Sequence, residues 1–157
     1  RPGLSQSARR GCNPLGRGSA ALRGLAPRPG RVLDLAAGSG EASEPLVRAG
    51  IDVDAIDPFT HAAYHARIGR LCEQLTFEQI ASGAIEGRTY DLIVCSFALH
   101  LCPVSRLPAL AMALRRVGGR LWVISPHKRP AISEAWCWRA ESTILIERVH
   151  LRSYAGI

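Results

Sequence analysis

The sequence contains little lysine, few aromatic residues and no long hydrophobic run. Lys128 is the one lysine among 20 basic residues, and aromatic side chains make up 6% of the chain. Aliphatic residues and alanine are nonetheless abundant enough to build the layered core of an α/β protein. Because no apolar run approaches the roughly 20 residues that cross a bilayer, we expect no membrane segment and no membrane partner.

Paired cysteines are also missing. The chain has five cysteines, an odd number, and no two of them form a Cys-x-x-Cys pair. This pattern argues against a disulfide framework and against a zinc knuckle. We therefore expect a cytoplasmic protein in a reducing compartment, with Cys95 as a small buried residue. His61 and His65 share one helix face, but no glutamate or cysteine partner accompanies them, so no metal site is predicted.

Acidic residues are absent from the first 33 positions, which hold seven arginines. Residues 34–157 contain 13 basic and 13 acidic side chains, so the net charge of +7 comes from those first positions. Their glycine, proline and serine content predicts a loosely ordered arm over 1–29 that precedes one domain over 30–157. Three roles stay open for the arm: a solvated leader, an organelle-targeting remnant, or a segment that contacts phosphates. Since the first residue is not methionine, we expect a processed, trimmed or fragmentary product.

The most informative stretch covers residues 31–40, where a buried strand containing an acid enters a glycine turn. The apolar residues of this strand suit a parallel sheet that is covered on both faces. Gly38 and Gly40 allow the backbone to pass close to a ligand, because neither carries a Cβ atom. We expect Ser39 to cap the following helix, which should run to residue 49 and stop at Gly50.

A second strand, predicted over 51–56, ends at Asp57, and Pro58 disfavours helix at that point. Asp57 follows Gly40 by 17 positions, close to the roughly 20 expected before the carboxylate that binds a ribose diol in βαβ units. A dinucleotide fingerprint fits less well, because position 43 is not glycine and Asp34 would repel a pyrophosphate. A tight turn that binds nothing stays open as an alternative.

Three motifs follow one another along the chain: the strand and turn over 32–40, Asp57, and the segment 90–100. In sequence, order and spacing they resemble the motifs of class I S-adenosylmethionine-dependent methyltransferases. The resemblance covers residues 30–125 well and the C-terminal part more loosely. It departs at Ala36 and Ala37, where the family more often has glycine and a small residue. It implies a Rossmann-like α/β fold with a doubly wound, mostly parallel seven-stranded sheet and helices on both faces, and it implies S-adenosylmethionine as the cofactor.

The resemblance also implies roles for particular residues. The acid and glycines of the turn would hold the methionine portion of the cofactor, and Asp57 would bind the ribose. Glu78, or a backbone group near residues 81–82, would meet the adenine, while Ser96 and Phe97 would flank the methyl group. In many of these enzymes the segment before the first strand helps to cover the cofactor, which adds a lid to the roles open for the arm. The implied cofactor-binding residues are Asp34, Ala36, Gly38, Gly40, Asp57, Pro58, Glu78, Ser96 and Phe97.

The rest of the chain alternates between strand and helix patterns. Helices are predicted over 59–71 and 107–116, strands over 75–80, 90–95 and 120–125, a helical turn or two around 131–135, and a closing antiparallel hairpin over 136–142 and 146–154. This alternation favours a parallel, doubly wound sheet with its site at the carboxyl ends of the strands.

The acceptor side of the site is predicted beyond the fourth and fifth strands. Methyl transfer needs an aligned acceptor and, for oxygen or ring nitrogen, removal of a proton. His100 is the candidate base, with a structural imidazole bonded to a neighbouring loop as the alternative. His127, Lys128 and Arg129 follow the fifth strand and suit a carboxylate, a phosphate or an RNA backbone, whereas a merely solvated loop is the competing interpretation.

Two classes of function therefore stay open. The first is a methyltransferase that acts on a small molecule or, less favoured, on RNA or protein. The second is a binding module that kept the fold without turnover, which a pocket filled by the protein's own side chains would favour. The balanced charge of residues 34–157 and the lack of an aromatic stripe argue against nucleic acid as the partner. The arm and the loop over 125–130 keep that partner open.

Overall fold

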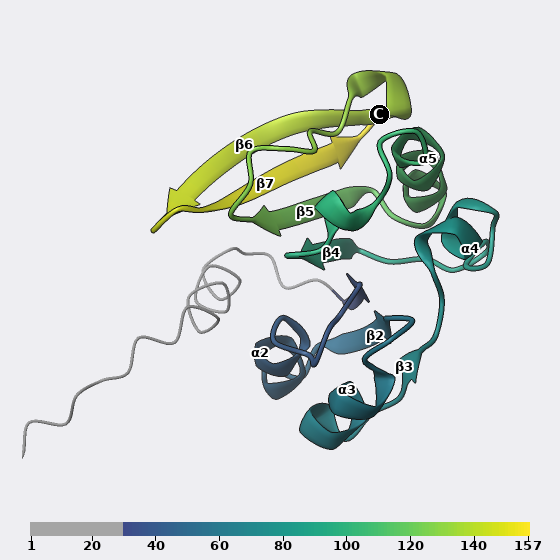
Figure 1. The fold of residues 1–157 in the computed structure, drawn as a ribbon, viewed down its shortest axis with the longest axis vertical. Helices are drawn as coiled ribbons and strands as arrows, with labels where there is room; N and C mark the ends of the chain where they lie inside the picture. Colours follow the sequence, from purple (N-terminus) through teal and green to yellow (C-terminus); the bar gives the residue numbers. More distant parts are fainter. Residues whose placement is uncertain (1–29) are drawn as a thin grey trace, which may run out of the picture.

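A computed structural model describes residues 30–157, and the predicted arm over 1–29 lies outside the described residues. Seven strands form one sheet in the order β3-β2-β1-β4-β5-β7-β6 (Figure 1). Strands β1 to β5 run parallel, and β7 is antiparallel to both of its neighbours. The strands are β1 (Arg31–Leu35), β2 (Asp52–Ile56), β3 (Cys72–Glu73), β4 (Leu92–Ser96), β5 (Arg120–Ser125), β6 (Trp138–Ile146) and β7 (Val149–Gly156). The predicted fold class is confirmed.

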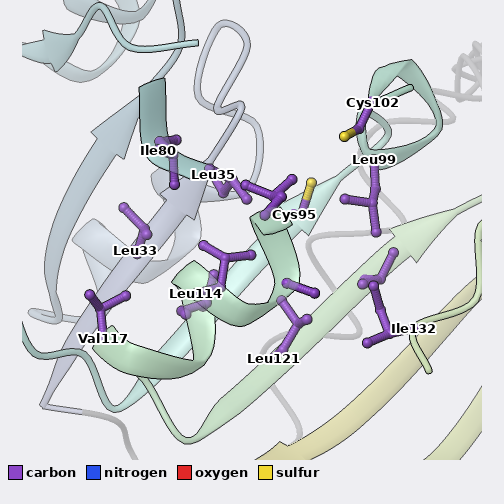
Figure 2. Packing of buried hydrophobic residues seen from close by; sticks show 14 of the residues in the cluster. Leu33, Leu35, Ile80, Cys95, Leu99, Cys102, Leu114, Val117, Leu121 and Ile132 are labelled. Carbon is purple, nitrogen blue, oxygen red and sulfur yellow. The ribbon is translucent and has the colours of Figure 1, made fainter. Parts of the chain in front are cut away.

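Helices cover both faces of this sheet. They are α2 (Ser43–Arg48), α3 (His61–Ile68), α4 (Phe77–Ala81) and α5 (Leu107–Val117), with 3-10 turns η1 (Leu99–Leu101) and η2 (Glu134–Trp136). Successive side chains of a strand point to opposite faces, so β1 contributes residues to two hydrophobic clusters. Leu33 and Leu35 join the cluster beneath α4 and α5, which Figure 2 shows from close by. Val32 packs on the other face with Leu46 of α2.

The prediction of a strand over 75–80 is wrong. The third strand is only β3, and residues from Phe77 onward form α4 instead. A capping box starts this helix: the Thr76 side chain accepts from the Gln79 amide, and the Gln79 side chain accepts from the Thr76 amide. This reciprocal pair satisfies amide groups that the first turn of a helix leaves free. Glu78, predicted in a strand, therefore lies in the first turn of α4.

Three smaller predictions change as well. Ser39 does not cap α2, because its hydroxyl donates to the Glu41 carboxylate and the residue preceding the helix is Ala42. The helix predicted over 59–71 is shorter and ends at Gly69, whose φ of 75° is left-handed. The expected closing hairpin is present as β6 and β7, with the 3-10 turn η2 in place of the short helix before it.

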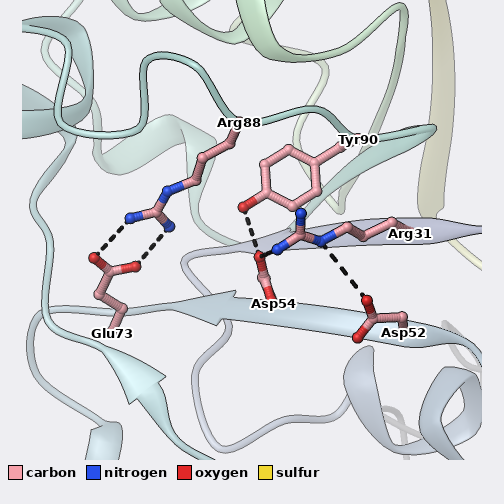
Figure 3. Close-up of polar contacts among 6 residues, drawn as sticks. All are labelled: Arg31, Asp52, Asp54, Glu73, Arg88 and Tyr90. Carbon is pink, nitrogen blue, oxygen red and sulfur yellow. Dashed lines mark hydrogen bonds and ion pairs between the residues drawn. The ribbon is translucent and has the colours of Figure 1, made fainter.

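Charged side chains join the first three parallel strands to one another and to the segment before β4. Arg31 contacts the Asp54 carboxylate at 2.7 Å, and the Tyr90 hydroxyl donates to the same carboxylate at 2.8 Å (Figure 3). The Arg88 guanidinium makes two hydrogen bonds with Glu73. Burial, followed by the bond to Asp54, raises the pKa of Tyr90 to about 12. These contacts join β1, β2, β3 and the segment before β4. The Arg31 contacts lie at the start of β1, whereas the register places Glu73 level with Leu35 at its carboxyl end.

Gly40 should be the turn glycine least tolerant of substitution. Its φ is 98°, and a Cβ atom there would lie 2.6 Å from Ile68 Cγ1 and 3.1 Å from Tyr64 Cδ2. Gly40→Ala should lower the free energy of unfolding by about 2–4 kcal/mol, since left-handed strain and overpacking add. Gly50→Ala is the matched control: φ is 78° and its surroundings are open, so strain alone should cost about 1–2 kcal/mol. Urea unfolding measures both, and equal losses would contradict the packing argument.

Candidate active site

The glycine turn follows the carboxyl end of β1 and contains three residues in left-handed backbone conformations. Gly38 and Gly40 have φ values of 60° and 98°, and Ala36 has 56°. A left-handed conformation costs an L-residue about 1–2 kcal/mol, which explains why glycine would suit position 36 better than alanine. The Ala37 amide donates to the Ile56 carbonyl at 3.0 Å, so the turn is fastened to the end of β2.

Asp57 holds the turn to the loop that follows β2. Its carboxylate accepts from the Gly38 amide at 3.1 Å, and from the Phe59 and Thr60 amides at 2.8 and 3.0 Å. The Thr60 hydroxyl donates to the Gly38 carbonyl at 2.7 Å, which closes a second link between the same two loops. Asp57 is 8% exposed, and two carboxylate oxygens accept about four hydrogen bonds. One accepting position therefore stays available for a ligand.

A cavity of about 230 Å³ opens beside Asp57. Its walls come from the ends of β1 and β2, from the loop before α4 and from the segment around η1. Most of them are apolar: Leu35, Ile56, Phe59, Leu75, Phe77, Ile80, Ala98, Leu101 and Pro103 line it. Four residues implied by the family resemblance also line it, namely Ala36, Asp57, Pro58 and Glu78. An apolar space with carboxylates on its wall suits a flat ring that carries hydroxyl and amino groups.

Asp34 lies behind the turn and does not line the cavity. It is fully buried, and its Oδ2 accepts from the Ser43 hydroxyl at 2.6 Å, which in turn accepts from the Tyr64 hydroxyl at 2.9 Å. Its Oδ1 has no hydrogen-bond partner within the described part of the chain. Burial raises the pKa of the Asp34 carboxyl to about 7, against the opposing hydrogen bond from Ser43. The carboxyl is therefore poised between its protonated and charged forms near neutral pH.

Ser96 and Phe97 end β4, and neither lines the cavity. Phe97 has a φ of 58°, its amide donates to the Ile124 carbonyl at 2.7 Å, and its ring packs against the cluster on the α2 face. Its side chain thus contributes to the core. Gly38 and Gly40 also lie outside the cavity lining, so these turn residues meet a ligand only where it extends past the cavity.

The four predicted acceptor-side residues are all exposed, and two of them contact each other. The rings of His100 and His127 meet edge to face with 4.9 Å between their centroids. Lys128 and Arg129 extend from the same loop and are exposed. His100 belongs to η1, and the next residue, Leu101, lines the cavity. The basic loop and the cavity are therefore joined through η1.

Two contributors to the site escaped sequence reasoning. Thr60 had a detectable signal, because an aspartate followed by proline and threonine is typical of a turn in which the carboxylate caps amides two and three residues ahead. Arg152 of β7 had none: it is 8% exposed and donates to the carbonyls of His127 and Lys128, 25 and 24 residues away. A contact across that separation depends on the strand register alone.

The remaining sequence features do not build a second site. His61 and His65 are exposed, and no three His, Cys, Asp or Glu side chains gather around a metal position within residues 30–157. Cys95 is fully buried, as predicted. None of the helices described between residues 30 and 157 has the length and apolar content that a bilayer crossing requires.

Comparison with known proteins connects this geometry to a family. The family described as a methyltransferase domain matches residues 33–121. An uncharacterised protein of Schizosaccharomyces pombe is 33% identical over 172 residues, covering 78% of this chain and 70% of that protein. The family match contains the glycine turn, Asp57 and the segment through η1.

Solved structures share the fold at low sequence identity. A TehB-like SAM-dependent methyltransferase from Corynebacterium glutamicum has a TM-score of 0.71 at 16% identity, covering 91% of this chain and 87% of that one. Magnesium protoporphyrin IX methyltransferase from Synechocystis, crystallised with SAM, has a TM-score of 0.62 at 18% identity, covering 92% of this chain and 77% of that one. An rRNA methylase from Escherichia coli has a TM-score of 0.61 at 17% identity, covering 90% of this chain and 62% of that one. The likeness therefore extends across enzymes with different acceptors.

The pH dependence of stability should report the Asp34 carboxyl. Its pKa is about 7 in the folded protein against the usual 3.8, so folding favours the protonated form. Its contribution is complete below about pH 4 and is lost as pH rises through about 7, a fall in the free energy of unfolding on the order of 4 kcal/mol. Asp34→Asn should remove this fall in urea unfolding between about pH 4 and 8. A variant with the slope of the parent would contradict the assignment.

Proposed function

The chain belongs to the methyltransferase-domain family, and on that premise we propose that it is an S-adenosylmethionine-dependent methyltransferase with a small-molecule acceptor. The observation that carries the proposal is the Asp57 carboxylate, fixed by three amides on the wall of an apolar cavity. A carboxylate held in this way is oriented before a ligand arrives, which reduces the entropy lost on binding.

The residues of the cavity fit an adenosine group. Asp57 accepts a hydrogen bond from a ribose hydroxyl at the one accepting position that its backbone partners leave open. Leu75, Phe77 and Ile80 supply apolar contacts for the adenine ring, and the Glu78 carboxylate accepts from its amino group. Ala36 and Pro58 complete the wall on either side of the ribose.

The carboxylates also fit the positive charge of the cofactor. One buried oxygen of Asp34 has no partner within residues 30–157. Asp34 lies just before the glycine turn, whose glycines lie outside the cavity lining. A cationic amine near the turn favours the charged form of this carboxyl and lowers its free energy. Gly38 and Gly40 let the backbone approach the methionine portion. The Ser96 side chain and the Phe97 backbone, beyond the cavity at the end of β4, face the methyl end in this proposal.

Little further chemistry is required of the protein. When bound, S-adenosylmethionine supplies a methyl group on a positively charged sulfur: the acceptor oxygen or nitrogen bonds to the methyl carbon, and the sulfur leaves as a neutral thioether. His100 takes the acceptor's proton onto a ring nitrogen; it is exposed and precedes Leu101, which lines the cavity. The rest of the rate enhancement comes from alignment of the acceptor with the methyl group.

Two competing functions are less well supported. A non-catalytic module would be favoured by a cavity filled with the protein's own side chains, whereas the cavity beside Asp57 is open within the described residues. RNA as the acceptor finds little support in residues 34–157, which balance 13 basic against 13 acidic residues.

Isothermal titration of the purified chain with S-adenosylmethionine and, separately, with NAD tests the proposal. Micromolar binding of the first and no binding of the second is the expected result, because Asp34 disfavours a pyrophosphate and favours a cation. Binding of neither compound would overturn the proposal and leave a non-catalytic module. Binding of NAD alone would assign the turn to a different cofactor.

Asp57→Ala should weaken S-adenosylmethionine binding by about 1.5–3 kcal/mol, the range for hydrogen bonds to a charged group. The variant also frees three amides, so its effect on the turn must be separated from its effect on the ribose. Thr60→Val is the matched control, because it breaks the other link between the same loops, the 2.7 Å bond to the Gly38 carbonyl. Calorimetry should find the control within about threefold of the parent. Equal weakening in both variants would show that loop attachment, not ribose binding, is the role of Asp57.

A further inference from the structure

The acidic residues of the site all come from one half of the chain. Asp34, Asp57 and Glu78 belong to β1, the end of β2 and α4. Between Asp91 and Glu134 the sequence contains no acidic residue, but it contains six arginine and lysine side chains and two histidines. The cofactor half of the site is therefore acidic, and the half built from β4, η1 and β5 is basic.

The basic loop after β5 has a defined path. Arg152, almost fully buried in β7, donates to the Lys128 carbonyl at 2.6 Å and to the His127 carbonyl at 3.1 Å. The His127 amide donates to the Ser125 hydroxyl at 3.0 Å. A guanidinium fork across two successive carbonyls fixes the backbone while leaving the side chains directed outward. The loop therefore presents its cations from a fixed base.

These cations have no acidic partner in the described structure. The salt bridges within residues 30–157 involve neither Lys128 nor Arg129, and both side chains are exposed. Adjacent uncompensated positive charges repel one another, and an anion bound between them would relieve that repulsion. His127 adds a donor in the same loop and rests against His100, which places the loop one residue from the cavity wall at Leu101.

We propose that the methyl acceptor is a small molecule with a carboxylate or phosphate group, and that His127, Lys128 and Arg129 bind this group. The inference rests on the proposed methyltransferase function and names its substrate class. The guanidinium offers paired donors and the ammonium a point charge, which together suit either anion. Anchoring the anion on this loop leaves the rest of the acceptor beside His100, the proposed proton acceptor. A single loop of three basic residues fits one anionic group better than a nucleic-acid backbone, which needs an extended basic surface.

The test is a titration of the full chain with inorganic phosphate and, separately, with acetate, at constant ionic strength maintained with sodium chloride. NMR of the histidine ring carbons and protons follows His100 and His127 in the parent. We expect saturable shifts of both histidines, and Lys128→Ala with Arg129→Ala should raise the apparent Kd at least tenfold. The anion that binds more tightly indicates whether the acceptor is a phosphate ester or a carboxylic acid.

The matched control is Arg116→Ala with Arg139→Ala, two exposed arginines outside the loop, which removes the same charge. Its Kd should stay within twofold of the parent. An equal loss of affinity in both double variants, or shifts that never saturate, would overturn the anion site and leave nonspecific charge attraction. Calorimetry with S-adenosylmethionine on the same proteins separates the two proposals. If the parent binds the cofactor but the loop variant binds the anion as tightly as the parent does, only the anion-site proposal is contradicted. If the parent does not bind the cofactor, the methyltransferase proposal is contradicted.

Discussion

The site depends on the Asp57 carboxylate, which joins the two loops at the carboxyl ends of β1 and β2. Three amides donate to it, one from the glycine turn and two from the loop that begins α3. Hydrogen bonds to a charged acceptor are stronger than neutral ones, so this side chain is the strongest of the links that hold the two loops together, beside the Thr60 and Ala37 bonds. The same carboxylate forms part of the cavity wall.

Around this joint the fold separates its charges. The acidic side chains of the site lie on β1, just after β2 and on α4, while the segment from β4 to β5 carries only basic charges. The acidic half suits the cationic cofactor that we propose, and the basic half suits the anionic acceptor that we propose. Burying Asp34 with one unpartnered oxygen lowers stability near neutral pH. A protein retains such a group where a ligand compensates it, which supports the cofactor assignment.

Sequence reasoning reached the sheet and the cofactor side, because both depend on local patterns. Continuous apolar strands, the glycines of the turn and Asp57 at a strand end are read directly from neighbouring residues. The strand predicted over 75–80 failed because apolar content outweighed the capping box of Thr76 and Gln79, which starts α4. Long-range contacts stayed hidden: the fork of Arg152 on the loop after β5 and the meeting of His100 with His127 require the finished sheet.

A crystal structure of the chain with S-adenosylhomocysteine is the most direct test. We expect a ribose hydroxyl within about 3 Å of Asp57 Oδ2, the hydrogen-bond distance for an O–H donor, because Oδ2 accepts from one amide and Oδ1 already accepts from two. We also expect the adenine ring between Leu75, Phe77 and Ile80, and an intact set of amide bonds from the glycine turn to Asp57. Adenosine bound elsewhere, or a ribose held by another carboxylate, would contradict the central role of Asp57.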